Sequence, residues 1–364
     1  MFAASPFVDI STTSGGSGYQ FQLSLGFDLS DGFGTIVALL LSLVLVLVLM
    51  PPLIRKMHAG GMVGRDVNKK TKGSVAELGG IAALFAFSVT LSLVVGLGKL
   101  IGNVAEPPFL AAISVFFMAS MIGLIDDISD IRQRLKAVVV GFAALPLLLV
   151  HLGPEIVDLP FGLEIRFVPE MYLVYWLVLV PIGVTGIANA MNMSAGYNGL
   201  ESGQIVMVSA SLLLIGVLRE SPDFSMLIFA SLLGCSLGLF AFNRYPARVF
   251  IGDIGTLGLG AAIGAGAILG HLEFYGLIAI APAFYEAGAT FYYGFRRKNG
   301  ERKEACRNPV IAGDGTLRPP PGSEHYTLGF LILSRKPMTE RNLVRVLLGL
   351  YAASGIAALL LSMV

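Results

Sequence analysis

Charged residues are scarce in this chain. Only 13% of its 364 residues are Asp, Glu, Lys or Arg, whereas 55% are hydrophobic, and the mean hydropathy is +0.77. Because about a quarter of the residues in a soluble domain are charged, this composition excludes a water-soluble globular protein. We therefore expect an all-α, polytopic integral membrane protein.

Cysteine is also scarce, and one end of the chain has no basic residue. Cys235 lies in an apolar run and Cys306 in a basic loop, so neither a disulfide framework nor a sulfur-ligated metal is expected. The first 34 residues contain no Lys or Arg, which a cleavable secretory signal requires near its start. We expect 1–34 to be a mature N-terminal segment on the outer side and 35–364 to be one membrane domain.

Long apolar runs make up most of that domain. A helix needs about 20 apolar residues to cross about 30 Å of hydrocarbon. Runs of about this length predict ten transmembrane helices, at 35–54, 78–99, 108–125, 136–152, 172–190, 202–219, 225–243, 254–271, 274–295 and 342–364.

Basic residues alternate between the loops. All but three of the 25 Lys and Arg lie in or beside the loops that follow the odd-numbered spans, and the exceptions are Lys99, Arg166 and Arg219. Cytoplasmic loops are enriched in basic residues, so both termini are expected to face outward. The acids and amides gather in the same inner loops, which predicts a site that opens on the cytoplasmic face.

Two adjacent acids end the third span, in the run GLIDDISDIRQRLK. An aspartate inside lipid costs about 2.5 to 3.5 kcal/mol, so Asp126 and Asp127 directly after an apolar run call for a cation. Asp130 and Arg134 are more simply interpreted as a solvated helix pair.

Asparagine and glycine interrupt the junction of spans five and six, in NAMNMSAGYNGLESGQ. An asparagine carbonyl can ligate a hard cation, and glycine lets the backbone approach a ligand closely. Turn chemistry alone accounts for Asn198 and Gly199 but not for Asn192. In NRYPARVFIGDIGT, Asp253 begins span eight, where it is either a helix N-cap or a ligand of a metal bound to phosphate.

These runs, together with KPMTERNL at 336–343, resemble the polyprenyl-phosphate N-acetylhexosamine-1-phosphate transferases, which are ten-span membrane enzymes. Within that family the chain looks most similar to the eukaryotic and archaeal UDP-N-acetylglucosamine:dolichyl-phosphate N-acetylglucosamine-1-phosphate transferases. The resemblance covers about residues 35–364 and implies that this domain is a transferase domain. It implies transfer of the sugar phosphate from a UDP-N-acetylhexosamine to a polyprenyl or dolichyl phosphate, with release of UMP.

The resemblance also implies roles for individual residues. Asn192 and Asp253 would ligate Mg²⁺, with Mn²⁺ as the alternative ion, and Lys136 would contact phosphate. Asp126 and Asp127 would be the catalytic acidic pair, acting either as a base or by positioning the substrates. The residues that would contact nucleotide or sugar are Asp66, Asn68, Lys69, Glu77, Asn198, Phe250 and Arg307.

A long cytoplasmic loop, 296–341, separates spans nine and ten and is expected to cover the site. The family often has an Arg-His-Arg cluster there, whereas this chain reads Cys306-Arg307-Asn308, with His325 further along. Glu286, inside span nine, is either functional or packed against a polar neighbour.

The expected partners are the two substrates, membrane lipids and a second copy in a homodimer, with no nucleic acid. The membrane would be the plasma membrane of a prokaryote or the endoplasmic reticulum of a eukaryote. A bacterial-type donor, UDP-N-acetylmuramoyl-pentapeptide, stays an alternative within the class. Outside it, a secondary transporter stays possible in principle, although we find no internal repeat or broken mid-membrane helix in the sequence.

Overall fold

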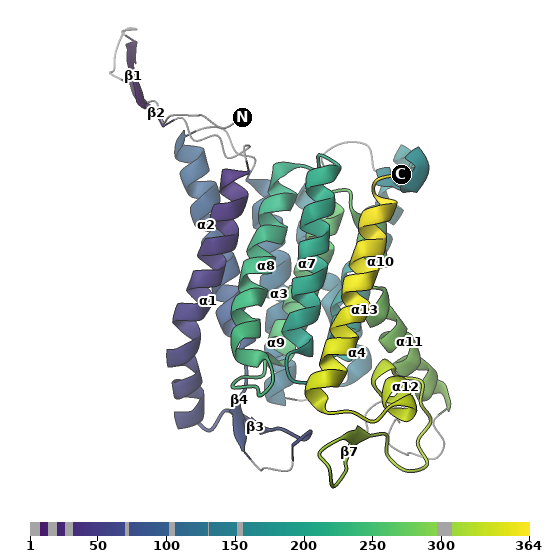
Figure 1. The fold of residues 1–364 in the computed structure, drawn as a ribbon. Helices are drawn as coiled ribbons and strands as arrows, with labels where there is room; N and C mark the ends of the chain where they lie inside the picture. Colours follow the sequence, from purple (N-terminus) through teal and green to yellow (C-terminus); the bar gives the residue numbers. More distant parts are fainter. Residues whose placement is uncertain are drawn as a thin grey trace.

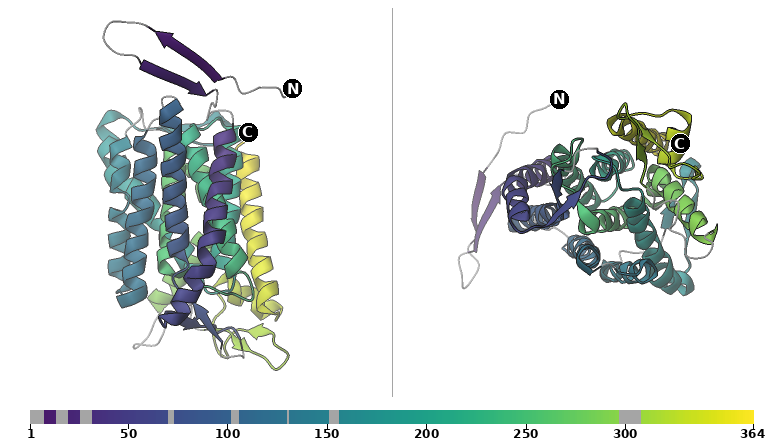
Figure 2. Two further views of the ribbon diagram at one scale, coloured as in Figure 1. Left: turned by 90° about the vertical axis from the view of Figure 1, so that its left-hand side faces the viewer. Right: turned by 90° about the horizontal axis from the view of Figure 1, so that it is seen from below.

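The computed structural model describes residues 8–13, 20–25, 32–69, 73–101, 106–129, 131–150, 156–296 and 308–364. Its helices stand side by side in one bundle, and the described strands form small two-stranded sheets outside it (Figure 1, Figure 2). The strands pair as β1 Val8–Thr13 with β2 Gln20–Leu25, β3 Val63–Arg65 with β4 Ser74–Ala76, β5 Ile156–Asp158 with β6 Glu164–Arg166, and β7 Val310–Ile311 with β8 Leu317–Arg318.

Eight helical stretches in the described residues are long and apolar enough to cross a membrane. They are α1 Phe33–Ala59, α2 Gly80–Ile101, α3 Pro107–Ser129, the stretch Pro169–Met193, α7 Leu200–Leu218, α8 Asp223–Asn243, α9 Gly252–Leu269 and α13 Glu340–Leu361. The chain is therefore a mostly helical, polytopic membrane protein, as its composition predicts. The count of ten spans and the direction of the termini stay predictions.

The two other predicted spans, at 136–152 and 274–295, coincide with interrupted helices. The first consists of α4 Gln133–Phe142 and the 3-10 helix η2 Leu145–Val150, and the second of α10 Glu273–Ala279 and α11 Ala281–Arg296. Pro146 and Pro282 lie just after the two breaks. Proline lacks an amide hydrogen and clashes with the preceding turn, so each interruption has a local cause.

Proline also shapes the fifth predicted span. Its helix passes from α5 Tyr172–Val174 through a π-helical turn, Tyr175–Leu179, into α6 Val180–Met193. Pro181 lies two residues after that turn, where a widened turn accommodates the missing amide hydrogen.

Helix α9 is the centre of the bundle and packs against α3 and α6. Its glycines allow close approach, since a Cβ at Gly260 would lie 2.9 Å from the Cα of Ala188 on α6. Near the start of α9, a Cβ at Gly123 of α3 would overlap the backbone of Asp253. The end of α3 and the beginning of α9 are thereby in direct backbone contact.

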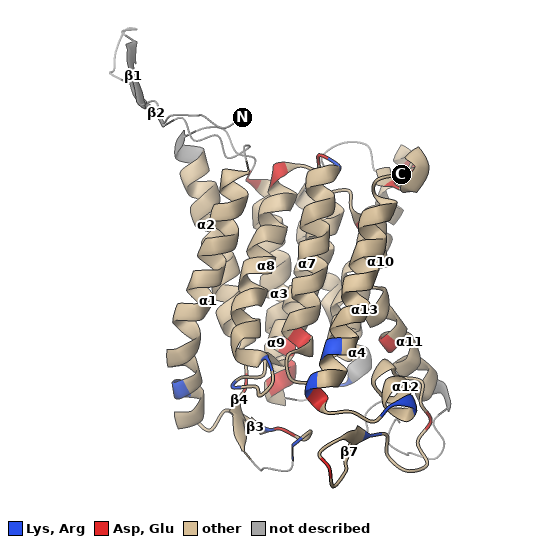
Figure 3. Cartoon of the chain, viewed as in Figure 1, with Lys and Arg blue, Asp and Glu red and all other residues tan. Residues whose placement is uncertain are grey.

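Charged residues gather at one end of the bundle (Figure 3). That end carries the β3–β4 hairpin, β7, β8 and α12 Leu328–Arg335, whereas α1 begins and α13 ends at the opposite end (Figure 1). The amide of Phe250 donates to the carbonyl of Ala76 at 2.8 Å, which ties the loop after α8 to strand β4. Segments far apart in the sequence thus meet at the charged end.

Candidate active site

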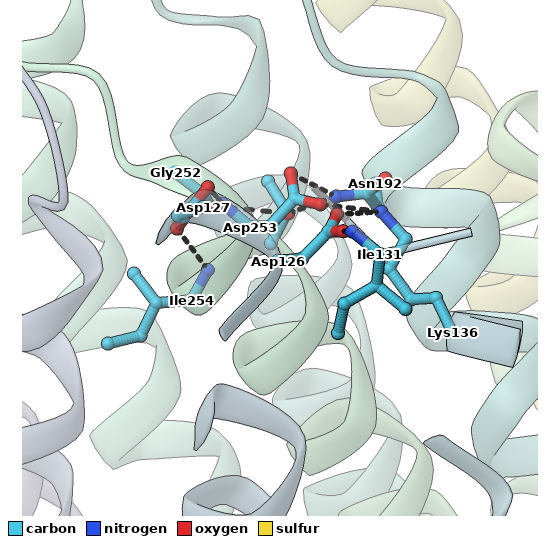
Figure 4. Close-up of polar contacts among 9 residues, drawn as sticks. Asp126, Asp127, Ile131, Lys136, Asn192, Gly252, Asp253 and Ile254 are labelled. Atoms are coloured by element: carbon cyan, nitrogen blue, oxygen red, sulfur yellow. Dashed lines mark hydrogen bonds and ion pairs between the residues drawn. The ribbon is translucent and has the colours of Figure 1, made fainter. Parts of the chain in front are cut away.

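Four helices bring polar side chains to one place at the charged end (Figure 4). We call this group the acidic cluster, and its members are Asp126 and Asp127 of α3, Lys136 of α4, Asn192 of α6 and Asp253 of α9. Three carboxylates and one ammonium leave a formal excess of negative charge. The structure therefore brings together five residues that the sequence analysis selected from three separate loops.

Lys136 lies between two of the carboxylates. Its Nζ is 2.6 Å from Oδ2 of Asp126 and 2.6 Å from Oδ2 of Asp253. Only 3% of the Lys136 side chain is exposed, against 28% for Asp253, so the ammonium is buried while one carboxylate still faces solvent. Asp126 is fixed further by the amide of Ile131, which donates to its Oδ1 at 2.6 Å.

Asn192 contacts Asp253 from the neighbouring helix. Its Nδ2 donates to Oδ1 of Asp253 at 2.8 Å and to Oγ1 of Thr256 at 2.7 Å. The two residues proposed as metal ligands are therefore adjacent, although 61 positions separate them in the chain. The end of α6 and the start of α9 supply them because these two helices pack along each other.

Asp127 has a different surrounding from Asp126. Its Oδ1 accepts from the amide of Asp253 at 2.9 Å, and its Oδ2 accepts from the amide of Ile254 at 3.0 Å. These amides belong to the first turn of α9, which has no intrahelical acceptor for them. Asp127 thus caps α9 from another helix, and Asp253, for which an N-cap role was one interpretation, instead directs its side chain toward Lys136 and Asn192.

The oxygen donors of this cluster fit a magnesium ion. Mg²⁺ is usually held by one or two carboxylates together with substrate phosphates and water, not by an all-protein cage. In the described residues no group of three or more His, Cys, Asp or Glu converges in the way such a cage requires. Both oxygens of Asp127 accept from backbone amides, and those of Asp126 and Asp253 accept from Ile131, Lys136 and Asn192. An ion held by Asp126, Asp253 or the Asn192 amide oxygen would therefore replace some of these side-chain contacts.

A second group of polar residues is mostly buried. We call it the amide cluster, and its members are Asp66, Asn68, Lys69, Asn198 and Glu340. Lys69 pairs with Oδ2 of Asp66 at 2.6 Å, and Nδ2 of Asn198 donates to that same oxygen at 2.9 Å. The β3–β4 hairpin, the turn before α7 and the start of α13 therefore share one hydrogen-bond network.

Glu340 is the centre of the amide cluster, and the sequence analysis did not select it. Its Oε1 accepts from the backbone amide of Asn198 at 2.8 Å, from Asn198 Nδ2 at 2.8 Å and from Asn68 Nδ2 at 3.2 Å. The side chain is 3% exposed. A carboxylate at the first residue of a span was the available signal, within the quoted run KPMTERNL.

Three buried acceptors in the amide cluster have no hydrogen-bond partner in the described part of the chain, namely Oδ1 of Asn68, Oδ1 of Asn198 and Oε2 of Glu340. Buried acceptors are normally satisfied, so unused ones at a site mark places where a ligand or water can donate. Since Asp66 and Glu340 take both amide hydrogens of Asn198, its carbonyl oxygen is the group left for a ligand.

Glu77 and Phe250 lie at the connection between strand β4 and the loop before α9. The amide of Gly79 donates to the carbonyl of Phe250 at 2.9 Å, and both side chains are half-buried. The Glu77 carboxylate is near enough to Asp127 for their charges to repel. This pair therefore borders the acidic cluster and does not belong to the amide cluster.

The remaining candidates fall elsewhere. Arg307 lies outside the described residues, as does Asp130, and His325 is exposed. Glu286 accepts from the amide of Leu328 at 2.8 Å, which fixes the start of α12 to α11. Glu286 thus packs against a polar neighbour, the backbone amide of Leu328.

Comparison with known proteins assigns the family. The model of glycosyl transferase family 4 matches residues 109–271, which contain the whole acidic cluster. A protein of Methanocaldococcus jannaschii, provisionally named a glycosyltransferase, is 30% identical over 91% of this chain and 96% of its own length. The chain belongs to glycosyl transferase family 4.

Two other members of glycosyl transferase family 4 carry more specific names. A Saccharolobus solfataricus protein, provisionally named UDP-N-acetylglucosamine–dolichyl-phosphate N-acetylglucosaminephosphotransferase, is 33% identical over 60% of this chain and 66% of its own length. A phospho-N-acetylmuramoyl-pentapeptide-transferase of Streptococcus gordonii is 28% identical over 76% of this chain and 86% of its own. The family resemblance inferred from the sequence is confirmed, and the relatives' names support an enzyme.

Proposed function

We propose that the protein transfers N-acetylglucosamine-1-phosphate from UDP-N-acetylglucosamine to a polyprenyl or dolichyl phosphate at the cytoplasmic membrane face. An oxygen of the lipid phosphate attacks the sugar-linked phosphorus, the bond to the bridging oxygen breaks, and UMP leaves. Family membership and the name of the Saccharolobus solfataricus relative support this reaction. The concentration of basic residues in the loops at the charged end supports the cytoplasmic orientation.

The observation that carries the proposal is the contact of Asn192 and Asp253 beside Lys136. Asn192 and Asp253 would hold Mg²⁺ or Mn²⁺ through the amide oxygen and the carboxylate. When bound, the ion would neutralise diphosphate charge during transfer. Lys136 supplies a fixed positive charge at the same place, which favours the charge that develops on the phosphoryl oxygens.

The two aspartates of the acidic pair have separate roles in this proposal. Asp126 holds the Lys136 ammonium in position, and Asp127 holds the first turn of α9, which carries Asp253. A phosphate is already largely ionised near pH 7, so the acceptor lipid needs no strong base. Positioning and charge stabilisation therefore account for both residues.

The amide cluster is proposed as the nucleotide subsite. The free carbonyl oxygen of Asn198 can accept from an imide N–H such as that of uracil, and Asp66 and Asn68 hold the surrounding backbone. Lys69 belongs to this cluster, whereas Glu77 and Phe250 border the acidic cluster and are assigned to the nucleotide on the family resemblance, as Arg307 is to the sugar or phosphate.

The proposal is tested by the identity of the product. Purified protein is incubated with polyprenyl phosphate, MgCl₂ and, separately, UDP-N-acetylglucosamine, UDP-N-acetylgalactosamine or UDP-N-acetylmuramoyl-pentapeptide, and the lipid is identified by mass spectrometry. We expect a diphosphate-linked N-acetylglucosamine and stoichiometric UMP. Product only from the pentapeptide donor would favour the function named for the Streptococcus gordonii relative. A transporter, the alternative outside this class, would release no UMP with any donor.

A further inference from the structure

A cavity of about 720 Å³ lies between the end of α8 and the start of α13, and no member of the acidic cluster lines it. Four arginines contribute to its wall, two from the segment after α8 and two from the first turns of α13. They are Arg244, Arg248, Arg341 and Arg345. Among the described residues, no acidic side chain lines the cavity.

These arginines lack acidic partners within the described part of the chain. Arg345 donates only to the neutral amide oxygen of Asn342, at 3.3 Å. Arg248 donates to the carbonyl of Ala241 at 3.3 Å and stacks 4.5 Å from the ring of Phe242. Four positive charges around one cavity would repel each other, and an anion with several oxygens would relieve that repulsion.

Apolar side chains also line the cavity. They include Phe240 of α8 and Val344 and Leu348 of α13, and both helices are long enough to cross a membrane. Helix α13 runs along the edge of the bundle (Figure 2), and its outward residues Val346 and Leu350 are 42% and 39% exposed. The cavity therefore combines arginine side chains with apolar ones, and it lies beside a surface of α13 that faces hydrocarbon.

The cavity lies toward the charged end of the bundle (Figure 3). Its arginines lie at the charged end of the bundle, where basic residues also mark the lower end of α13 (Figure 3). Basic pockets between membrane helices at this level are suited to anionic lipid headgroups. Asn198, assigned above to the nucleotide subsite, also lines the cavity, so competition with UDP separates a lipid headgroup from the donor nucleotide.

We propose that this cavity binds an anionic glycerophospholipid, with its phosphate on the four arginines and an acyl chain along Phe240 and Leu348. Guanidinium groups can meet a phosphodiester through paired hydrogen bonds, and the bound lipid would brace the first turn of α13. Because Glu340 occupies that turn, the lipid would also steady the amide cluster.

The test is lipid retention by the full chain in native mass spectrometry. Protein in neutral detergent is titrated with phosphatidylglycerol or phosphatidylcholine of the same acyl chains. We expect preferential phosphatidylglycerol adducts, and an affinity loss of roughly tenfold to thirtyfold in the double variant Arg341→Gln/Arg345→Gln. The control Arg318→Gln/Arg335→Gln removes the same charge from exposed positions outside the cavity and should bind as the unaltered chain does.

Two results would overturn the proposal. One is equal phosphatidylglycerol binding by the unaltered chain and the Arg341/Arg345 variant, with both eluting as the same folded species in size-exclusion chromatography. The other is displacement of phosphatidylglycerol by UDP or by inorganic phosphate at comparable concentration, which would assign the cavity to a soluble anion. A charge-retaining variant, Arg341→Lys/Arg345→Lys, should keep part of the preference, and complete loss in it together with a changed elution profile would indicate unfolding instead.

Discussion

Lys136 is a buried cation that contacts the carboxylates of Asp126 and Asp253. Without its charge, these two carboxylates would repel each other. We expect Lys136→Gln to lower the rate of UMP release by about 10²-fold to 10³-fold, the usual loss when one charge-stabilising donor is removed. Lys136→Arg keeps the charge but changes its shape, so it should retain more activity than the glutamine variant. Unchanged turnover of Lys136→Gln would exclude a role for this ammonium in the reaction.

Glu340 is the site residue that the sequence analysis missed, and a variant tests its role. Glu340→Gln keeps the size of the side chain but removes the charge that accepts three hydrogen bonds from Asn198 and Asn68. Hydrogen bonds to a charged group contribute about 1.5 to 3 kcal/mol, so UMP binding measured by calorimetry should weaken by roughly tenfold or more. We expect the KM for the UDP-sugar to rise more than kcat falls. A fall of kcat with an unchanged KM would contradict a positioning role for Glu340.

At the scale of elements, the start of α9 depends on contacts from α3. Gly252 has φ +71°, and a Cβ there would lie 2.7 Å from Oδ2 of Asp127. Gly252→Ala should therefore lower stability by about 1 to 3 kcal/mol, through backbone strain and displacement of the cap. Thermal unfolding in detergent measures this change.

The matched control is Gly349→Ala on the exposed side of α13, where a Cβ would meet nothing within 4 Å. Alanine favours a helix over glycine by up to about 1 kcal/mol, so this variant should be neutral or slightly stabilising. Equal unfolding temperatures for both variants would contradict the account of the α9 start.

The sequence predicted the elements to different degrees. Apolar length located the eight continuous spans well, because crossing a membrane demands that length of any helix. It did not reveal that α4 is followed by η2 or that α10 and α11 are separate, because apolarity alone does not record a local break. Pro146 and Pro282 were the available signals.

At the scale of the whole molecule, α1 begins and α13 ends at the end of the bundle that lies away from the charged loops (Figure 1). Labelling with a membrane-impermeant maleimide tests whether that side is external, in a Cys306→Ser background where Cys235 is buried. Phe161→Cys, exposed at the end of the bundle that carries Val364, should react in intact cells. Lys336→Cys, exposed after α12, should react only after permeabilisation. The reverse pattern would invert the proposed orientation.

The site could be predicted only in part from the sequence. The cost of an acid in lipid singled out Asp126 and Asp127, and Asn192 and Asp253 stood out in polar runs at span ends. The role of Lys136 came from the family resemblance alone. Partner assignments needed the fold, since Glu340 meets Asn198 across 142 positions and the α9 cap comes from Asp127 across 126. The homodimer and the covering of the site by 296–341 stay predictions.

The central claim is that Asn192 and Asp253 act together on a metal-bound diphosphate. The most direct measurement is UMP release as a function of MgCl₂ or MnCl₂ for the unaltered chain, Asn192→Ala, Asp253→Ala and the double variant. We predict that each single variant loses at least about 10²-fold in turnover and that the double variant is hardly worse than either one, as for residues that work as a unit. Retained turnover in both single variants, with an unchanged metal requirement, would contradict the account.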